Sequence, residues 1–276
     1  MVNGIFYPDS PEALASRLAS WGLKEGAPAF GSQAIIAPHG AWDLTGSIAA
    51  SAFVSAQGKG GKTGRPISRV LLLGTHHQGS EEGIYLSESG AFETPLGDLR
   101  VDQKLNRKLS SCSTLIRVND IPHLSEHSLE VLLPLVKYCL PKAKIVPILM
   151  AGRRPCLISG LAKALCIVLE RHMEESLFVI SSSVSHGFDP ALALSMADEF
   201  CGLLENMDAE AYLVRLAYGR ISASGGALVG ALLESGLLKN KCFSSLLPLA
   251  QYRGETGETV YYGAFSDSPN PIHNGA

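Results

Sequence analysis

Short apolar runs alternate along this chain with longer segments whose apolar residues recur every three or four positions. The short runs are typical of buried β-strands and the longer segments of helices. Strands are predicted at residues 33–37, 69–73, 84–93, 144–149, 177–182, 242–249 and 258–265. Helices are predicted at residues 11–21, 44–55, from 102 onward, 125–138, 155–171, 190–205, 208–218 and 225–234. The alternation predicts an α/β/α sandwich with a mostly parallel or mixed central sheet.

No segment of the sequence clearly separates two domains. A chain of 276 residues is within the usual size of one α/β domain. Residues 57–66 are rich in Gly and Lys and are interpreted as a surface loop, and residues 266–276 as a loose tail. We therefore expect a single domain over residues 1–276.

Three of the predicted strands run directly into histidine. The first leads to His39, the second to His76 and His77, and the third to His186. In open α/β sheets, ligands bind in the crevice outside the carboxyl ends of the strands. The three strand ends therefore predict one polar site that is able to bind a metal. Because His76 and His77 are adjacent and point in different directions, at most one of them is expected to face it.

Composition narrows the class of protein. With 46% hydrophobic and 18% charged residues, the chain is typical of a well-packed globular protein. The net charge of −3 gives no basis for nucleic-acid binding. No apolar run approaches the ~20 residues of a membrane helix, and the N-terminus lacks the pattern of a signal peptide. The six cysteines form no Cys-x-x-Cys pair, which favours a reduced, cytoplasmic protein.

Two short motifs are weighed against simpler interpretations. The Gly58–Thr63 segment is similar to a phosphate-binding loop, but alanine stands at position 56, where the motif needs glycine. It also follows a helix and precedes a strand, which reverses the required order. His123–His127 matches His-x-x-Glu-His, the inverted zinc-peptidase signature. Pro122 places His123 at or before the first helical turn, so zinc-dependent hydrolysis through His123 and His127 is kept only as an alternative.

Other titratable residues are less informative. His127 and Glu130 lie three positions apart and are expected to share a helix face. Glu255 and Glu258 lie in a turn between two late strands, and composition does not choose between them. His172 and His273 are expected to be solvated.

Together these segments resemble the Memo family over almost the whole chain. The fold of that family is shared with class III extradiol dioxygenases, which cleave catechol rings with non-heme iron. The resemblance is carried by residues 4–8 (Gly-Ile-Phe-Tyr-Pro), 37–42 (Ala-Pro-His-Gly-Ala-Trp), 73–77 (Leu-Gly-Thr-His-His), 94–99 (Thr-Pro-Leu-Gly-Asp-Leu), 126–130 (Glu-His-Ser-Leu-Glu) with Pro134, and 252–255 (Tyr-Arg-Gly-Glu).

The resemblance implies a metal site and a proton carrier. It assigns His39, His77 and Glu255 as ligands, with His77 rather than His76 at the family position. Two histidines and a carboxylate would form the facial triad that leaves open positions on Fe(II); Zn and Cu are the alternative metals. His186 would serve as acid/base with help from His127. The family carries aspartate where this chain has Ser183, which removes a carboxylate that would orient His186.

Three functions follow from this interpretation. The first is an Fe(II)-dependent dioxygenase or other oxidoreductase that acts on a small, catechol-like chelating substrate. The second is a non-catalytic Memo protein that binds a metal, a peptide or a small ligand, and the absence of aspartate at Ser183 favours it. The third is a zinc-dependent hydrolase. The resemblance also implies, for microbial relatives, a radical-enzyme partner and a small companion protein (the AmmeMemoRadiSam partners), and it leaves an oligomer open.

Overall fold

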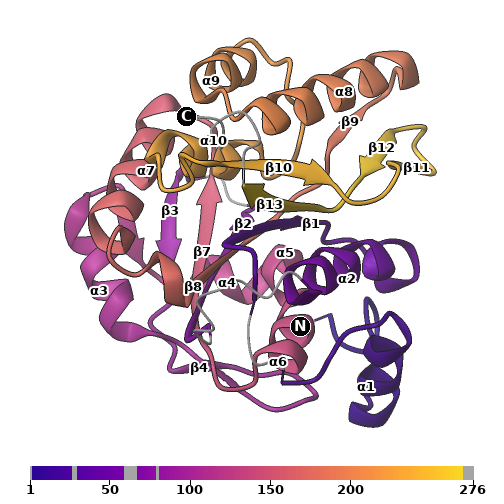
Figure 1. Ribbon diagram of the computed structural model, residues 1–276, viewed down its shortest axis with the longest axis vertical. Helices are drawn as coiled ribbons and strands as arrows, with labels where there is room; N and C mark the ends of the chain where they lie inside the picture. Colours follow the sequence, from indigo (N-terminus) through magenta and orange to yellow (C-terminus); the bar gives the residue numbers. More distant parts are fainter. Residues whose placement is uncertain (1, 27–29, 59–66, 79–80, 270–276) are drawn as a thin grey trace.

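The computed structural model describes residues 2–26, 30–58, 67–78 and 81–269. A central eight-stranded sheet has the strand order β10-β13-β1-β8-β2-β7-β3-β6 (Figure 1). The four inner strands β1, β8, β2 and β7 are parallel, so their carboxyl ends lie at one edge of the sheet. Strands β13 and β3 run antiparallel to them on either side. The predicted mixed sheet is confirmed.

The sheets contain thirteen strands in the described residues. Their bounds are β1 Ala34–Ala37, β2 Arg69–Thr75, β3 Gly83–Leu86, β4 Ala91–Phe92, β5 Leu99–Arg100, β6 Ile116–Val118, β7 Lys144–Ala151, β8 Ser176–Ser181, β9 Ser185–Gly187, β10 Lys241–Ser245, β11 Ala250–Arg253, β12 Thr259–Tyr262 and β13 Phe265–Pro269. The helices are α1 Pro11–Ser20, α2 Trp42–Gly58, α3 Gln103–Cys112, α4 Ile121–Ser125, α5 His127–Glu130, α6 Leu133–Cys139, α7 Pro155–Leu169, α8 Pro190–Asn206, α9 Ala209–Ala217 and α10 Gly226–Ser235, with a 3₁₀ turn at Met173–Glu175.

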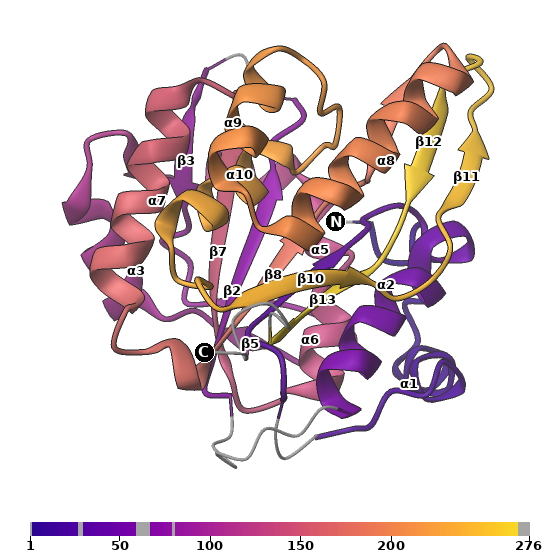
Figure 2. The ribbon, with the colours of Figure 1, turned by 45° about the horizontal axis from the view of Figure 1, so that its top comes forward.

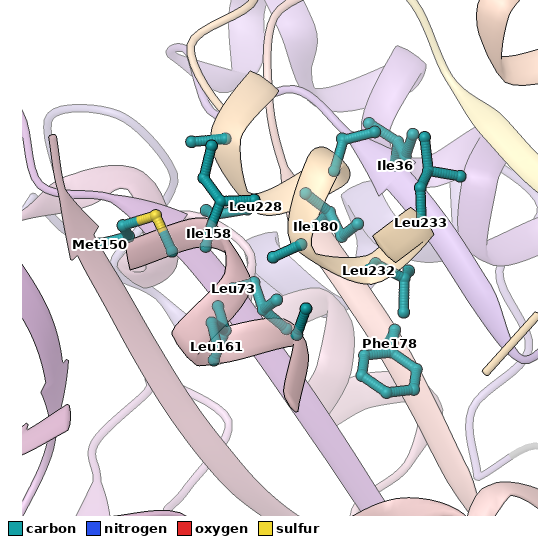
Figure 3. Packing of buried hydrophobic residues seen from close by; sticks show 14 of the residues in the cluster. Ile36, Leu73, Met150, Ile158, Leu161, Phe178, Ile180, Leu228, Leu232 and Leu233 are labelled. Atoms are coloured by element: carbon teal, nitrogen blue, oxygen red, sulfur yellow. The ribbon is translucent and has the colours of Figure 1, made fainter. Parts of the chain in front are cut away.

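The inner strands are buried on both faces and supply side chains to two cores. In β8, Phe178 and Ile180 point to one core, whereas Leu177 and Val179 point to the other. This alternation follows from the two-residue period of a strand. Helices α3, α7, α8, α9 and α10 cover the first face, and α1, α2 and α6 cover the second. Figure 3 shows side chains of α7 (Ile158) and α10 (Leu232) packed in the core on the first face. Because helices cover both faces, the three-layer arrangement is confirmed.

The segment predicted as one helix over residues 125–138 instead starts at the last residue of α4 and contains two short helices, α5 and α6. Glu126 has an extended backbone (φ −96°, ψ 124°) between α4 and α5. Its side chain accepts a hydrogen bond from the Ser128 N–H and caps α5. Pro134, near the start of α6, lacks the N–H that a continuous helix would require. Glu126 is therefore the N-cap of α5.

The C-terminal region contains more strands than the sequence predicts. Strands β11, β12 and β9 form a separate three-stranded sheet, and the β11–β12 hairpin runs beside α8 (Figure 2). Residues 266–269 belong to β13, which pairs with β1 and β10, so the expected loose tail does not begin at residue 266. Most of the Gly/Lys-rich loop, residues 270–276 and His273 lie outside the described residues. Across the described parts of the chain, no helix is both long and apolar enough to cross a membrane.

Candidate metal centre

The carboxyl ends of the parallel strands bring the predicted histidines together. His39 lies two residues beyond the end of β1, and His77 lies two residues beyond the end of β2. Strand β8 lies between β1 and β2, so the two histidines approach each other across its end. Their ring centroids are 5.2 Å apart.

A third imidazole completes this group. His127, the first residue of α5, has its ring centroid 5.7 Å from that of His39 and 5.4 Å from that of His77. Each of the three residues offers one ligand atom, and these atoms all lie within 4.8 Å of one another. We call His39, His77 and His127 the histidine cluster. Imidazole nitrogens bind Zn, Cu and Fe, so the cluster is suited to a divalent metal.

Hydrogen bonds orient two rings of the cluster. The Ser181 hydroxyl donates to the Ser128 carbonyl (2.6 Å), so it accepts from His39 Nδ1 (2.8 Å). His77 Nδ1 donates to Glu126 Oε1 (3.0 Å), because a carboxylate only accepts. Both rings therefore carry a proton at Nδ1, which leaves Nε2 as the nitrogen that can bind a metal. Such hydrogen bonds are the usual means of fixing a metal-binding tautomer.

Glu126 is a buried hydrogen-bond acceptor that holds His77 in position. Its side chain is 1% exposed, and it also accepts the backbone N–H of His77 at 2.6 Å and that of Ser128 at 2.8 Å. Burial disfavours its charged form, but the hydrogen bonds from His77 and Ser128 outweigh burial and lower its pKa to about 2. Glu126 is therefore ionised at neutral pH and balances positive charge at the cluster.

Burial favours the neutral form of two histidines of the cluster, His39 and His127. It lowers the pKa of His39 to about 3, with a further contribution from the neighbouring His77 and His127. The pKa of His127 is lowered chiefly by burial, against the opposing effect of Glu126. Neutral imidazoles are the form that binds metals.

Metal-free protein is expected to lose stability in acid. His39 has a folded pKa of about 3, below the ordinary value of 6.5, so the unfolded state binds more protons between these values. The contribution of neutral His39 to the free energy of unfolding is complete above pH 6.5 and is lost as the pH falls toward 3. The contribution of ionised Glu126 is lost between pH 4.5 and about 2. Urea unfolding at pH 7.5, 6, 5 and 4 measures this loss. His39→Asn should flatten the decline between pH 6.5 and 4, and an unchanged slope would contradict the assignment.

Gly74 sets the close approach of α5 to β2. A Cβ at this position would lie 2.5 Å from Leu129 Cδ2 and 2.6 Å from Ser128 Oγ. Gly74→Ala is therefore expected to destabilise the fold by about 1–3 kcal/mol and to displace the helix that carries His127. Gly202→Ala in α8 is the matched control, because its Cβ would contact nothing within 4 Å. Urea midpoints compare the two; equal stability would contradict the close packing.

The structure places Glu255 and His127 differently from what their expected roles require. Glu255, expected as the third ligand, is exposed in the turn between β11 and β12 and is not part of the cluster. The third member of the cluster is His127, which was expected to help His186 in proton transfer. Burial lowers the pKa of His186, and the charge of Glu258, a second carboxylate of this turn, opposes that shift.

His186 lines a cavity beside the cluster. The cavity, of about 210 Å³, is lined by Thr75, His77, Met150, Gly152, Arg153, His186, Ser224 and Ala227. His186 is held by a bond from its backbone N–H to Ser222 Oγ (3.0 Å). Burial is the main cause that lowers its pKa, so the ring is neutral at pH 7. The expected proton carrier therefore shares this cavity with His77.

Ser183 does not replace the missing aspartate as a partner of His186. Its hydroxyl lies 3.1 Å from Ser224 Oγ and accepts the Ser224 N–H at 3.1 Å. Its backbone N–H donates to Ser224 Oγ at 2.9 Å. Ser183 thus fixes a loop at the edge of the cavity. Among the described residues, no hydrogen bond reaches the His186 ring from a protein partner.

The His-x-x-Glu-His motif does not form one helical face. His123 is in α4, and its ring contacts Phe92 edge-on at 5.8 Å, whereas His127 begins α5. His123 lines a second cavity of about 240 Å³, with Glu126 at its boundary. This geometry does not support a zinc-peptidase site. His76 packs against Tyr85 and is also outside the cluster, and His172 pairs with Glu175 at 2.8 Å.

Ser181, Glu126 and Arg153 were not recognised as part of the site from the sequence. Glu126 was considered as the glutamate of a peptidase motif and as part of the 126–130 segment of the family resemblance, but not as a hydrogen-bond partner of His77. Their positions in the sequence could have indicated two of them, because Ser181 is the last residue of β8 and Arg153 follows the end of β7.

Comparison with known proteins identifies the family of the chain. The family model described as "Memo-like protein" matches residues 1–247. The chain belongs to the Memo family. It is 30% identical over 249 residues to a MEMO1 family protein of Desulfurococcus amylolyticus, covering 85% of each chain. It is 28% identical over 209 residues to one of Metallosphaera sedula, covering 72% of each.

The match to the Memo family includes the whole histidine cluster but ends before Glu255. Among solved structures, an uncharacterized protein of Escherichia coli K12 superposes with a TM-score of 0.45 at 10% identity. The superposition covers 73% of this chain and 86% of that protein.

Proposed function

We propose that this Memo protein is a metal-dependent oxidoreductase that binds Fe(II) at the histidine cluster and acts on a small chelating substrate such as a catechol. The observation that carries the proposal is the convergence of three imidazoles at the carboxyl edge of the parallel strands, beside a cavity that contains His186. Three protein ligands leave further coordination positions open for other molecules.

The residues of the chain have distinct roles in this proposal. His39, His77 and His127 would hold the metal, which when bound would supply a Lewis acid and a redox centre. Glu126 and Ser181 orient His77 and His39. His186 is neutral at pH 7, so its ring can accept the proton of a substrate hydroxyl in the cavity.

An oxygen-uptake assay tests the proposed reaction. Protein loaded with Fe(II) without oxygen is mixed with a panel of catechols in an oxygen electrode. Uptake that depends on substrate and is abolished in His77→Ala is the expected result. His186→Gln should lower kcat and retain stoichiometric iron. Absence of uptake with every catechol would contradict the oxidoreductase proposal.

One observation favours a second function, binding of a metal or ligand without turnover. Ser183 stands where the family carries aspartate, and it bonds Ser224 rather than His186. A base without an orienting partner is less effective in proton transfer. Stoichiometric metal binding with no uptake in the assay would support this alternative.

A further inference from the structure

Arg153 occupies, on a third strand, the place that His39 and His77 occupy on theirs. It lies two residues beyond the end of β7, as His39 does for β1 and His77 for β2. Strands β7 and β2 are parallel neighbours, with Thr75 paired in register to Met150. The same sheet edge that positions the imidazoles therefore also positions one guanidinium.

The Arg153 side chain is fixed before any ligand arrives. Its Nη1 donates to the Ile221 carbonyl and its Nη2 to the Ala223 carbonyl, both at 3.1 Å. A guanidinium carries five N–H donors, so these two bonds leave others for a ligand. Gly152, with a φ of +97°, makes the turn that leads from β7 to Arg153. Arg153 is thereby pre-organised rather than mobile.

The charges around the cavity select for an anion. Arg153 and His186 both line it, and no carboxylate is among its lining residues. Burial is the first cause of the lowered pKa of His186, and the Arg153 charge lowers it further, which agrees with their proximity. Glu258 acts on His186 in the opposite direction and is not part of the lining. A ligand that reaches the cluster from this cavity meets a fixed cation.

We propose that Arg153 binds a carboxylate of the small molecule whose other end reaches the histidine cluster. The substrate class is then a carboxylated chelator, for instance an aromatic acid with adjacent hydroxyls, rather than a neutral diol. The planar guanidinium matches a carboxylate with two parallel hydrogen bonds. The cavity of about 210 Å³ limits this ligand to a small molecule. The inference rests on the proposed function for the metal-bound end of the ligand.

Binding of two matched probes tests the inference. Isothermal titration without oxygen compares 3,4-dihydroxybenzoate with catechol on Fe(II)-loaded protein. The dihydroxybenzoate is expected to bind about tenfold to a hundredfold tighter, the usual range for a charge-assisted pair. Arg153→Gln should reduce the two affinities to near parity, and Arg153→Lys should retain part of the preference.

Arg154→Gln is the matched control. Arg154 is the next residue, pairs with Glu82 and does not line the cavity, so its replacement should leave the preference unchanged. Stoichiometric iron binding by Arg153→Gln shows that the variant is folded. Equal affinity for both probes in the native chain, an unchanged preference in Arg153→Gln, or no binding of the dihydroxybenzoate would overturn the inference. If the native chain prefers the dihydroxybenzoate but shows no oxygen uptake, the inference about Arg153 is supported and only the proposed reaction is contradicted.

Discussion

His127→Ala is expected to abolish stoichiometric binding of Fe(II) and Zn(II), whereas Glu255→Ala is expected to bind as the native chain does. His127 shares the cluster with His39 and His77, and Glu255 is exposed in the β11–β12 turn. Removal of a residue that only orients a ligand commonly costs about 10–100-fold in metal affinity, so loss of a ligand should cost about a hundredfold or more. Anaerobic titration calorimetry at pH 7.5 measures both affinities.

His39→Ala and His77→Ala extend the comparison and should lose binding to the same degree. Circular dichroism during urea unfolding checks that each variant is folded. The opposite pattern, with binding lost in Glu255→Ala and kept in His127→Ala, would restore the carboxylate expected from the sequence and contradict the cluster.

Glu126→Ala is expected to destabilise the protein by about 3 kcal/mol or more. The substitution leaves the buried N–H group of Ser128, and the partly buried N–H group and ring of His77, without their acceptor. Each unsatisfied buried donor costs about 1–3 kcal/mol. The His77 ring also loses its orientation, so metal affinity should fall by about 10–100-fold. Urea unfolding of metal-free protein and metal titration measure the two effects.

Glu126→Gln separates the charge of this side chain from its shape. The amide oxygen can still accept one hydrogen bond, so a smaller loss of stability than in Glu126→Ala is expected. Glu255→Ala again serves as a control, since it removes an exposed carboxylate. A native free energy of unfolding in Glu126→Ala would show that Glu126 does not anchor the site.

The sequence predicts the sheet because its inner strands are buried on both faces. Their continuous apolar runs predict strands locally, and tertiary contacts stabilise the same structure. The ends of β1 and β2 then determine where His39 and His77 lie. The short helices near His127 are less predictable. Their boundaries depend on a single extended residue, Glu126. Its hydrogen bonds come partly from His77, which follows strand β2 and is 49 positions away in the sequence.

The third member of the histidine cluster could not be predicted from residue spacing for the same reason. Whether His127 or the carboxylate from the late turn reaches the cluster depends on the path of the β11–β12 hairpin, which packs beside α8. That path is set by long-range pairing of β12 with β9, at Val260 and His186. Local sequence patterns contain little information about such pairings.

Anomalous diffraction from crystals loaded with Fe(II) in the absence of oxygen tests the three-histidine site most directly. Data collected on both sides of the iron edge locate the metal without reference to activity. The expected result is one peak about 2.1 Å from a ring nitrogen of each of His39, His77 and His127. A peak coordinated by Glu255 or Glu258, or by His123, would contradict the site, as would iron-loaded crystals with no peak at the cluster.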